Sequence, residues 1–365
     1  MQVSFHDFSN QNKKLKLSIL KEINHILNFS DNSNHDKYIK EFEDEFANYH
    51  NVDFAIGVDS GTTALQLAMI ASGIKKGDEV IVPSYTYIAT ALAVSNIGAK
   101  PVFVDIKESD LTINESLIEK KITDKTKAII PVHIHGNICE LNSILSICKK
   151  YNLQLIEDAS QAHGASYKNK KIGSFGIGCF SLHTSKTLGG IGDAGIITSN
   201  DKRIHDKIKQ LMIPDNNSEE IINSKRTPCD IDAIQAAIVK IKLTKLDELN
   251  KRKNKIARLY DRLISNKLVK KIITAKDSYS VYRDYCIIIN ERERLQEFLF
   301  KKGIETKARY KLPLHLTKTF EYLGYKKGDS PIAEKMANEV LCLPSFIGIS
   351  DDNIKYICDE INKFV

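Results

Sequence analysis

The sequence predicts an α/β protein with a mostly parallel central sheet sandwiched by helices, followed by a smaller C-terminal α+β domain. Short apolar, β-branched runs alternate with helical stretches between residues 54 and 199. A long charged helical segment follows at 231–265. After it, the sequence pattern changes to isolated strands and helices. Continuous apolar strands separated by helices are typical of a parallel sheet buried on both faces.

The expected elements follow the chain in order. Residues 11–50 have apolar positions three to four apart, which predicts amphipathic helices. The expected sheet strands are apolar runs at 55–58, 79–82, 101–105, 128–132, 153–156, 177–182 and 195–199. The helices between them are expected at 61–72, 86–97 and 140–150. In the C-terminal part we expect a strand at 286–289 and helices at 293–302 and 351–364.

These patterns predict two domains. The N-terminal helices and the large sheet domain are placed at residues 1–245, and a linker helix with the small domain at 246–365. A chain of 365 residues is long enough to bury a large core in this arrangement.

The composition is that of a soluble globular protein. Apolar residues make up 42% and charged residues 27% of the chain, and no apolar run has membrane-spanning length. The first residues do not form a signal peptide, so we expect a cytoplasmic protein without a membrane partner. The net charge of +7 comes from dispersed lysines without interleaved aromatic residues. It therefore indicates an anionic substrate and no nucleic-acid partner.

Cysteines and histidines do not form a metal motif. Seven cysteines are scattered along the chain without a C-x-x-C pair, so we expect reduced and mostly buried thiols. His133 and His135 form an H-x-H pair for which no third ligand is evident. We therefore expect no metal site.

One lysine and one aspartate indicate the chemistry. Lys186 lies in the run F-S-L-H-T-S-K-T-L-G-G, and Asp158 ends the apolar strand that begins near residue 153. An amine for a Schiff base and a carboxylate for a pyridinium nitrogen are the two groups that pyridoxal phosphate (PLP) chemistry requires. Gln161 could bond the phenolic oxygen of the same ring, and Tyr87 could cover its face. A helix-capping role for Asp158 and a simple packing role for Tyr87 remain alternatives.

A phosphate-binding segment is expected at Ser60, Gly61, Thr62 and Thr63, between a strand and the helix 61–72. A helix start offers unpaired N–H groups and the positive end of the helix dipole. Ser181, five residues before the lysine, could reach the same phosphate. A plain helix cap by Ser60 is the alternative.

Together these residues resemble the DegT/DnrJ-type sugar aminotransferases, PLP enzymes of fold type I (the aspartate aminotransferase superfamily). The resemblance runs over nearly the whole chain and is carried by several motifs in order. They are S-G-T at 60–62, G-D-E-V-I-V-P-S-x-T-x at 77–87, V-F-V-D at 102–105, P-V-H-x-x-G at 131–136, E-D-A-x-Q-A-H-G-A at 157–165, Q-A-A-I at 235–238, P-L-H-L at 313–316 and L-G-Y-x-x-G-D-x-P-x-A-E at 323–334.

The resemblance implies a role for each of these side chains. Lys186 would form the aldimine with PLP, Asp158 would pair with its ring nitrogen, and Gln161 would lie near its phenolic oxygen. Tyr87 would stack on the ring. The residues Ser60, Gly61, Thr62, Thr63 and Ser181 would hold the phosphate.

The resemblance also implies the reaction and its partners. Such enzymes are homodimers with shared active sites that transfer an amino group, usually from glutamate, to a nucleotide-linked 3- or 4-ketosugar. The transfer is a ping-pong cycle that serves amino-sugar and surface-polysaccharide biosynthesis. The run 188–195 favours enzymes that act at sugar C3.

Departures from the family pattern fall in the substrate and dimer regions. The family's N-x-R pair, whose asparagine reaches the partner's cofactor phosphate, is replaced here by Pro228 and Asp230, and Asn223, Lys225 and Arg226 are the possible substitutes. Its small-domain histidine is replaced by Arg283, and its H-Y-P by Arg309-Tyr310-Lys311. These extra cations suit a diphosphate or a carboxylate. The candidate substrate residues are His183, Arg283, Arg309, Tyr310 and His315.

Two other functions remain open. A PLP-dependent sugar dehydratase of the same fold would carry histidine in place of the lysine, so Lys186 argues against it. A non-enzymatic, PLP-binding regulatory protein is the other alternative.

Overall fold

A seven-stranded sheet forms the centre of the chain in the computed structural model, which describes residues 2–7, 13, 15–28, 33–212 and 229–365. Its strands in spatial order are β1 (Phe54–Val58), β9 (Gly195–Ser199), β8 (Ile177–Ser181), β5 (Gln154–Asp158), β4 (Thr126–Ile129), β2 (Glu79–Pro83) and β3 (Lys100–Val104). Strand β9 is antiparallel to both neighbours, whereas the other pairings are parallel. The predicted mostly parallel sheet is therefore confirmed.

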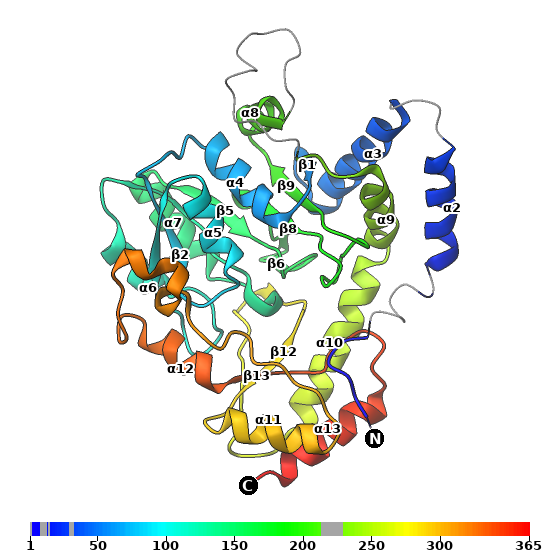
Figure 1. Cartoon of the computed structure of the whole chain (residues 1–365), viewed down its shortest axis with the longest axis vertical. Helices are drawn as coiled ribbons and strands as arrows, with labels where there is room; N and C mark the ends of the chain where they lie inside the picture. Colours follow the sequence, from blue (N-terminus) through cyan, green and yellow to red (C-terminus); the bar gives the residue numbers. More distant parts are fainter. Residues whose placement is uncertain (1, 8–12, 14, 29–32, 213–228) are drawn as a thin grey trace.

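Helices cover both faces of this sheet (Figure 1). On one face lie α4 (Gly61–Ala71), α5 (Ala89–Asn96) and α8 (Lys202–Met212), and on the other α3 (Ser33–His50), α7 (Leu141–Tyr151) and α9 (Ala233–Leu243). Successive residues of a strand pack alternately into the cores on the two faces of the sheet. Cys179 packs with the first group of helices and Phe180 with the second. This burial on both faces explains why the strands read as continuous apolar runs.

The predicted long helix over 231–265 is wrong, because the chain forms two helices there. Helix α9 ends at Leu243 and α10 (Leu246–Leu263) begins after a short break. The Thr244 hydroxyl donates to the Ile241 carbonyl, and the Lys245 N–H donates to the Lys242 carbonyl in a turn that interrupts the helix. The buried Leu243 and Leu246 on either side then pack into one core as the chain changes direction.

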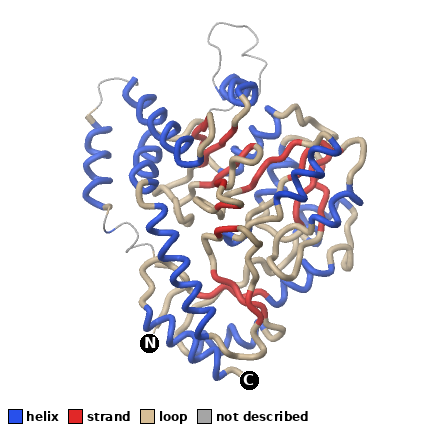
Figure 2. The backbone as a smooth tube through the Cα atoms, turned by 180° about the vertical axis from the view of Figure 1, so that it is seen from behind, coloured by secondary structure: helices blue, strands red, loops and turns tan. Residues whose placement is uncertain are grey.

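The C-terminal part contains a second, three-stranded sheet, β10 (Lys270–Lys271), β12 (Tyr285–Ile288) and β13 (Val340–Leu343). It is accompanied by α11 (Arg292–Lys301), α12 (Pro331–Glu339) and α13 (Asp351–Lys363). Val3 pairs with Ile304, so the first described residues pack with this part, and both ends of the chain lie at the same end of the molecule (Figure 2). The division at residues 245/246 stays a prediction.

The remaining elements are short or peripheral. They are α2 (Lys16–Leu27), α6 (Glu115–Ile118), η1 (Glu119–Lys121), η2 (Ile134–Gly136), η4 (Leu314–Leu316), η5 (Lys318–Leu323), and a small sheet of β11 (Ser278–Tyr279), β6 (Ser166–Tyr167) and β7 (Lys170–Lys171). Part of the predicted helical region 11–50 lies outside the described residues. No helix in the described ranges combines the length and the apolar character that crossing a membrane requires.

Two glycines bring the ends of β8 and β9 against the start of α4. A Cβ on Gly61 would lie 2.7 Å from the Ser181 Cβ, and one on Gly195 would lie 2.5 Å from the carbonyl carbon of Ser60. Both distances are shorter than a van der Waals contact, so only a residue without a side chain fits at either position. The strands therefore end directly at the first turn of α4.

Replacing Gly195 by alanine should push β9 away from Ser60 and lower the free energy of unfolding by about 1–3 kcal/mol, the usual cost of overpacking. Gly192→Ala is the matched control, because a Cβ there meets only the end of the flexible Gln235 side chain, at 3.1 Å. Urea unfolding of the two variants checks this. Equal stability would contradict the close approach.

Candidate active site

A cleft of about 510 Å³ opens beyond the carboxyl ends of the parallel strands. This is where open α/β sheets bind their ligands, and the volume is typical of a small-molecule site. The predicted site residues that line it are Ser60, Gly61, Thr62, Tyr87, Asp158, Gln161, Ser181, His183, Lys186, Arg283, Arg309 and Tyr310. The structure thus brings together side chains that are spread over 250 positions of the chain.

Asp158 lies at the floor of the cleft as the last residue of β5. Its side chain is buried, and its two carboxylate oxygens are held separately. Thr90 Oγ1 donates to Oδ2 at 2.8 Å, and the Ser160 N–H donates to Oδ1 at 3.2 Å. Each carboxylate oxygen retains a further lone pair, so this fixed group can accept a bond from a cationic ring nitrogen. The alternative role of Asp158 as a helix cap is wrong, because the described chain runs from β5 through turns to β6 and no helix begins after Asp158.

The amine of Lys186, which lines the cleft, has a lowered pKa. Burial lowers the pKa of its amine to about 7, and the positive charge of Arg283 adds to this effect. The carboxylates of Asp158 and Asp284 act in the opposite direction but do not compensate. Near neutral pH a large fraction of the amine is therefore unprotonated, the form that can act as a nucleophile or a base.

The first turn of α4 forms one end of the cleft. The Ser60 Oγ accepts the Thr63 N–H at 3.1 Å and lies 2.9 Å from the Thr63 hydroxyl, so Ser60 is the helix cap. Both the capping and the phosphate interpretations fit, since the cap leaves the first helical N–H groups, at Gly61 and Thr62, on the cleft wall. Ser181 packs against Gly61 at this end.

Aromatic side chains frame the opposite wall. Tyr87 is 55% exposed and its ring lies 6.1 Å from that of Tyr310, at an angle of 40°. Gln161 accepts from the His135 N–H at 2.8 Å and donates to the Tyr310 hydroxyl at 3.5 Å. These bonds fix the Gln161 amide at the edge of the cleft, where it could meet a ring oxygen.

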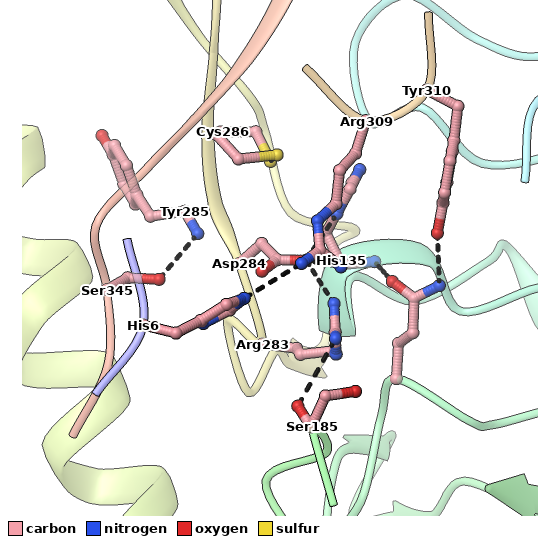
Figure 3. Close-up of polar contacts among 12 residues, drawn as sticks. His6, His135, Ser185, Arg283, Asp284, Tyr285, Cys286, Arg309, Tyr310 and Ser345 are labelled. Carbon is pink, nitrogen blue, oxygen red and sulfur yellow. Dashed lines mark hydrogen bonds and ion pairs between the residues drawn. The ribbon is translucent and has the colours of Figure 1, made fainter. Parts of the chain in front are cut away.

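Arg283, Asp284 and Arg309 form a charged cluster (Figure 3) that acts on the charge of the Lys186 amine. Arg283 donates to Asp284 Oδ2 at 2.5 Å, while Arg309 Nη1 lies 3.6 Å from the same oxygen. Burial by itself raises the pKa of Asp284, but the two arginines and His135 hold it well below its usual value. Two guanidinium groups thus share one carboxylate, which leaves this wall positively charged.

Two predicted positions, Thr63 and His315, do not line the cleft, and a third, His183, lies only at its edge. His183 lies on the exposed rim and bonds the Ser185 hydroxyl at 2.9 Å. His315 is buried outside the cleft, 3.0 Å from Glu334, so its assignment as a substrate residue is not supported. Thr63 is turned toward Ser60 rather than into the cleft.

The position of the family's cross-subunit asparagine, Pro228, lies outside the described residues. Its possible substitutes Asn223, Lys225 and Arg226 also fall in the range 213–228, which the structure does not describe. Asp230 pairs with Val58 through the backbone, at the edge of the sheet.

Several site residues were missed by sequence reasoning. Thr90 carries no motif, because a threonine inside a helix ordinarily bonds its own backbone. Asp284 and Lys307 come from the C-terminal part and reach the cleft only through the fold. The sole sequence signal was the position of Asp284 directly after Arg283.

The chain belongs to the DegT/DnrJ/EryC1/StrS aminotransferase family, whose profile matches residues 13–362. A "Pleiotropic regulatory protein" of Geobacillus stearothermophilus is 36% identical over all of this chain and 99% of its own length. The dTDP-3-amino-3,4,6-trideoxy-alpha-D-glucose transaminase of Streptomyces venezuelae is 37% identical over 83% of this chain and 80% of its own length. The crystal structure of S. venezuelae DesV has a TM-score of 0.93 at 32% identity, and covers 100% of this chain and 99% of the other.

The family depends on PLP, and PLP is the cofactor of this protein. The cleft suits the group chemically: it offers an anion site at α4, a buried carboxylate at Asp158 and an amine with a lowered pKa at Lys186. When bound, PLP supplies an electron sink for the carbanion at the substrate's reacting carbon.

The lowered pKa of Lys186 predicts how cofactor capture depends on pH. In the cofactor-free protein, the rate constant for capture of PLP should rise with pH up to about 7 and then level off, because the unprotonated amine is the reactive form. For an ordinary lysine, such as Nα-acetyl-lysine in solution, the rate constant should continue to rise until the pH reaches the amine pKa of about 10.4. Stopped-flow absorbance over pH 5–10 separates the two profiles. A protein profile still climbing beyond pH 9 would contradict the buried amine.

Proposed function

We propose that this protein transfers an amino group from glutamate to the keto carbon of a nucleotide-linked 3- or 4-ketosugar, in amino-sugar and surface-polysaccharide biosynthesis. The observation that carries the proposal is the joint placement of Lys186 and Asp158 in one cleft with the anion-binding start of α4. A buried amine with a pKa of about 7 is suited to both proton donation and proton removal near neutral pH. The names of the relatives support a nucleotide-linked sugar as the acceptor.

Each residue has a separate task in the proposed reaction. Gly61, Thr62 and Ser181 hold the cofactor phosphate, and Asp158 keeps the ring nitrogen protonated through its remaining lone pair. Thr90 is a positioning residue, because it fixes the Asp158 carboxylate without reaching the ring itself.

The Lys186 amine moves the proton that transamination requires. It removes the proton from the Cα atom of glutamate in the first half-reaction and delivers one to the former keto carbon of the sugar in the second. Both transfers need an amine that exchanges its proton readily. The lowered pKa supplies this property.

Arg283 and Arg309 are proposed to bind the α-carboxylate of the amino donor. Both lie close enough to Lys186 to affect its charge, so an anion that they hold must lie near the reacting carbon. A sugar diphosphate is separated from the keto carbon by part of the sugar ring, whereas the carboxylate of glutamate is bonded directly to the carbon that loses its proton. The deep position of the pair therefore favours the carboxylate.

The proposed active form is a homodimer with shared sites. Helix α2 supports this proposal, because Leu17, Leu20 and Leu27 are 82%, 51% and 73% exposed on its surface. A row of exposed leucines on one helix is typical of a surface that another chain covers.

The keto carbon is proposed to be C3, in line with the run 188–195. The S. venezuelae transaminase that matches this chain is named for a 3-amino product. A 4-keto substrate is the alternative, since a GDP-perosamine synthase also matches the chain.

A regulatory protein is the second candidate, because the G. stearothermophilus relative over the full length of the chain is named as one. This function predicts cofactor binding without turnover. A dehydratase is disfavoured by the lysine at position 186.

The half-reaction with glutamate tests the proposal. The visible absorbance of the PLP-loaded protein should shift when glutamate is added, and a panel of nucleotide-linked 3- and 4-ketosugars should then restore it with formation of an aminosugar of the expected mass. Lys186→Ala should abolish turnover. Asp158→Asn should slow it by roughly 10²–10⁴-fold, because the ring nitrogen loses its anionic partner.

Three results would decide against transamination. An unchanged spectrum with PLP bound would favour the regulatory function, and loss of a sugar hydroxyl without amination would favour the dehydratase. Substantial turnover by Lys186→Ala would remove the lysine from the mechanism.

The carboxylate assignment has its own test. Arg309→Leu should lower kcat/KM for glutamate by about 10–100-fold, the cost of losing a charged hydrogen-bond donor, while kcat/KM for the ketosugar stays the same. Lys307→Gln is the matched control, since it removes a cation from the same cleft wall. If kcat/KM for the sugar falls instead, the arginines bind the diphosphate.

A further inference from the structure

Two buried cysteines face each other in the small sheet, away from the proposed reaction. Cys286 of β12 and Cys342 of β13 are directly opposite in the antiparallel register, and their sulfur atoms are 2.9 Å apart. They are 4% and 0% exposed. The sequence concealed the pair, because 56 residues separate its members.

His135, from the other part of the molecule, lies beside this pair, with one ring nitrogen within 4.8 Å of both sulfur atoms. His135 lies in η2 with a backbone φ of 56°, a left-handed conformation that only a minority of non-glycine residues adopt. Its ring is buried, and its Nε2 has no hydrogen-bond partner among the described residues. Leaving a buried ring nitrogen unpaired is costly unless it has a ligand.

The other ring nitrogen of His135 determines the state of Nε2. His135 Nδ1 lies 3.3 Å from Asp284 Oδ2 (Figure 3). Asp284 Oδ2 accepts a hydrogen bond from Arg283 at 2.5 Å and lies 3.6 Å from Arg309 Nη1, so this oxygen is paired as an acceptor and Nδ1 donates its proton toward it. Nε2 therefore presents its lone pair, the arrangement by which carboxylates orient the histidine ligands of metal ions.

We propose that His135, Cys286 and Cys342 form a binding site for a single thiophilic d¹⁰ metal ion, Zn²⁺ or Cu⁺. One ring nitrogen of His135 and the two Sγ atoms lie within 4.8 Å of one another, and Nε2 is the ring nitrogen without a hydrogen-bond partner among the described residues. Metal–ligand bonds of about 2.0–2.3 Å can be reached from one central position by small side-chain shifts. Imidazole and thiolate are the ligands that these two ions prefer.

The charge of the surroundings fits such an ion. On binding, each thiol releases one proton to solvent, and Zn²⁺ with two thiolates is neutral. Cu⁺ with two thiolates carries one negative charge, which the surplus positive charge of Arg283, Arg309 and Asp284 balances. Either ion can therefore be buried without an unpaired charge.

The ion would fasten the small sheet to the wall of the cofactor cleft. Cys286 and Cys342 belong to β12 and β13, whereas the His135 backbone N–H holds Gln161 at the cleft edge. The backbone of Cys342 also pairs with Lys307, a residue that lines the cleft. One metal ion would thus join the two sides between which the substrate must bind.

Metal titration of the full-length, PLP-loaded protein tests the site. Under anaerobic conditions, Zn²⁺ and Cu⁺ are added separately in competition with a chromophoric chelator, and the melting temperature is followed in parallel. We expect one equivalent of at least one ion to bind and to raise the melting temperature. The two titrations decide which ion the site takes.

Cys342→Ser should weaken binding by at least the roughly 10–100-fold that loss of an outer partner of a metal site costs. Cys358→Ser is the matched control, since Cys358 is a buried thiol of the same C-terminal part that lies outside the cluster. It should bind the metal like the unaltered protein. His135→Ala serves as a second variant if Cys342→Ser folds poorly.

Three results would overturn the proposal. They are no stoichiometric binding of either ion by the unaltered protein, binding that Cys342→Ser and His135→Ala leave intact, and a freshly isolated chain lighter by two hydrogens in which Cys286 and Cys342 form a disulfide. Since the readouts are metal content and stability, a failure here is distinguishable from a failure of the transaminase proposal.

Discussion

The site depends above all on the burial of one amine within electrostatic reach of carboxylates and guanidinium groups. Burial lowers the Lys186 pKa to about 7, and Arg283 reinforces that effect against Asp158 and Asp284. The sheet places Asp158 at the carboxyl end of a central strand, and the close approach of Gly61 to Ser181 and of Gly195 to Ser60 brings the first turn of α4 to the same edge. The fold therefore brings an amine, a carboxylate and a helix N-terminus into one cleft.

Asp284 connects the two proposals through a single carboxylate. On one side it balances part of the charge of Arg283 and Arg309, which face the cleft beside Lys186. On the other it bonds His135 Nδ1, which leaves Nε2 without a partner among the described residues. Substrate recognition and the proposed metal site would in this way share one buried network, and the small sheet would be held where the arginines can meet a donor carboxylate.

Much of the fold was predictable because burial on both faces leaves a direct mark on the sequence. Every strand of the large sheet was expected within a few residues, and the residues of the glycine, lysine and aspartate motifs lie together in one cleft. Errors came where local pattern and packing disagree. The helical pattern runs through Thr244 without interruption, yet two buried leucines turn the chain there. His315 lies in a family motif, but it pairs with Glu334 outside the cleft.

The sequence by itself determined the fold class, the cofactor chemistry and the identity of Lys186 and Asp158, since these depend on residue type and on order along one stretch of chain. Only the tertiary structure decided which distant side chains act on them. Thr90 reaches Asp158 from 68 residues away, Arg283 lies beside Lys186, and His135 meets Cys286 and Cys342 across two parts of the molecule. Such contacts depend on long-range packing, and no spacing of residues along the chain predicts them. For this reason Lys186 could be found as an amine from the sequence, whereas its lowered pKa could not.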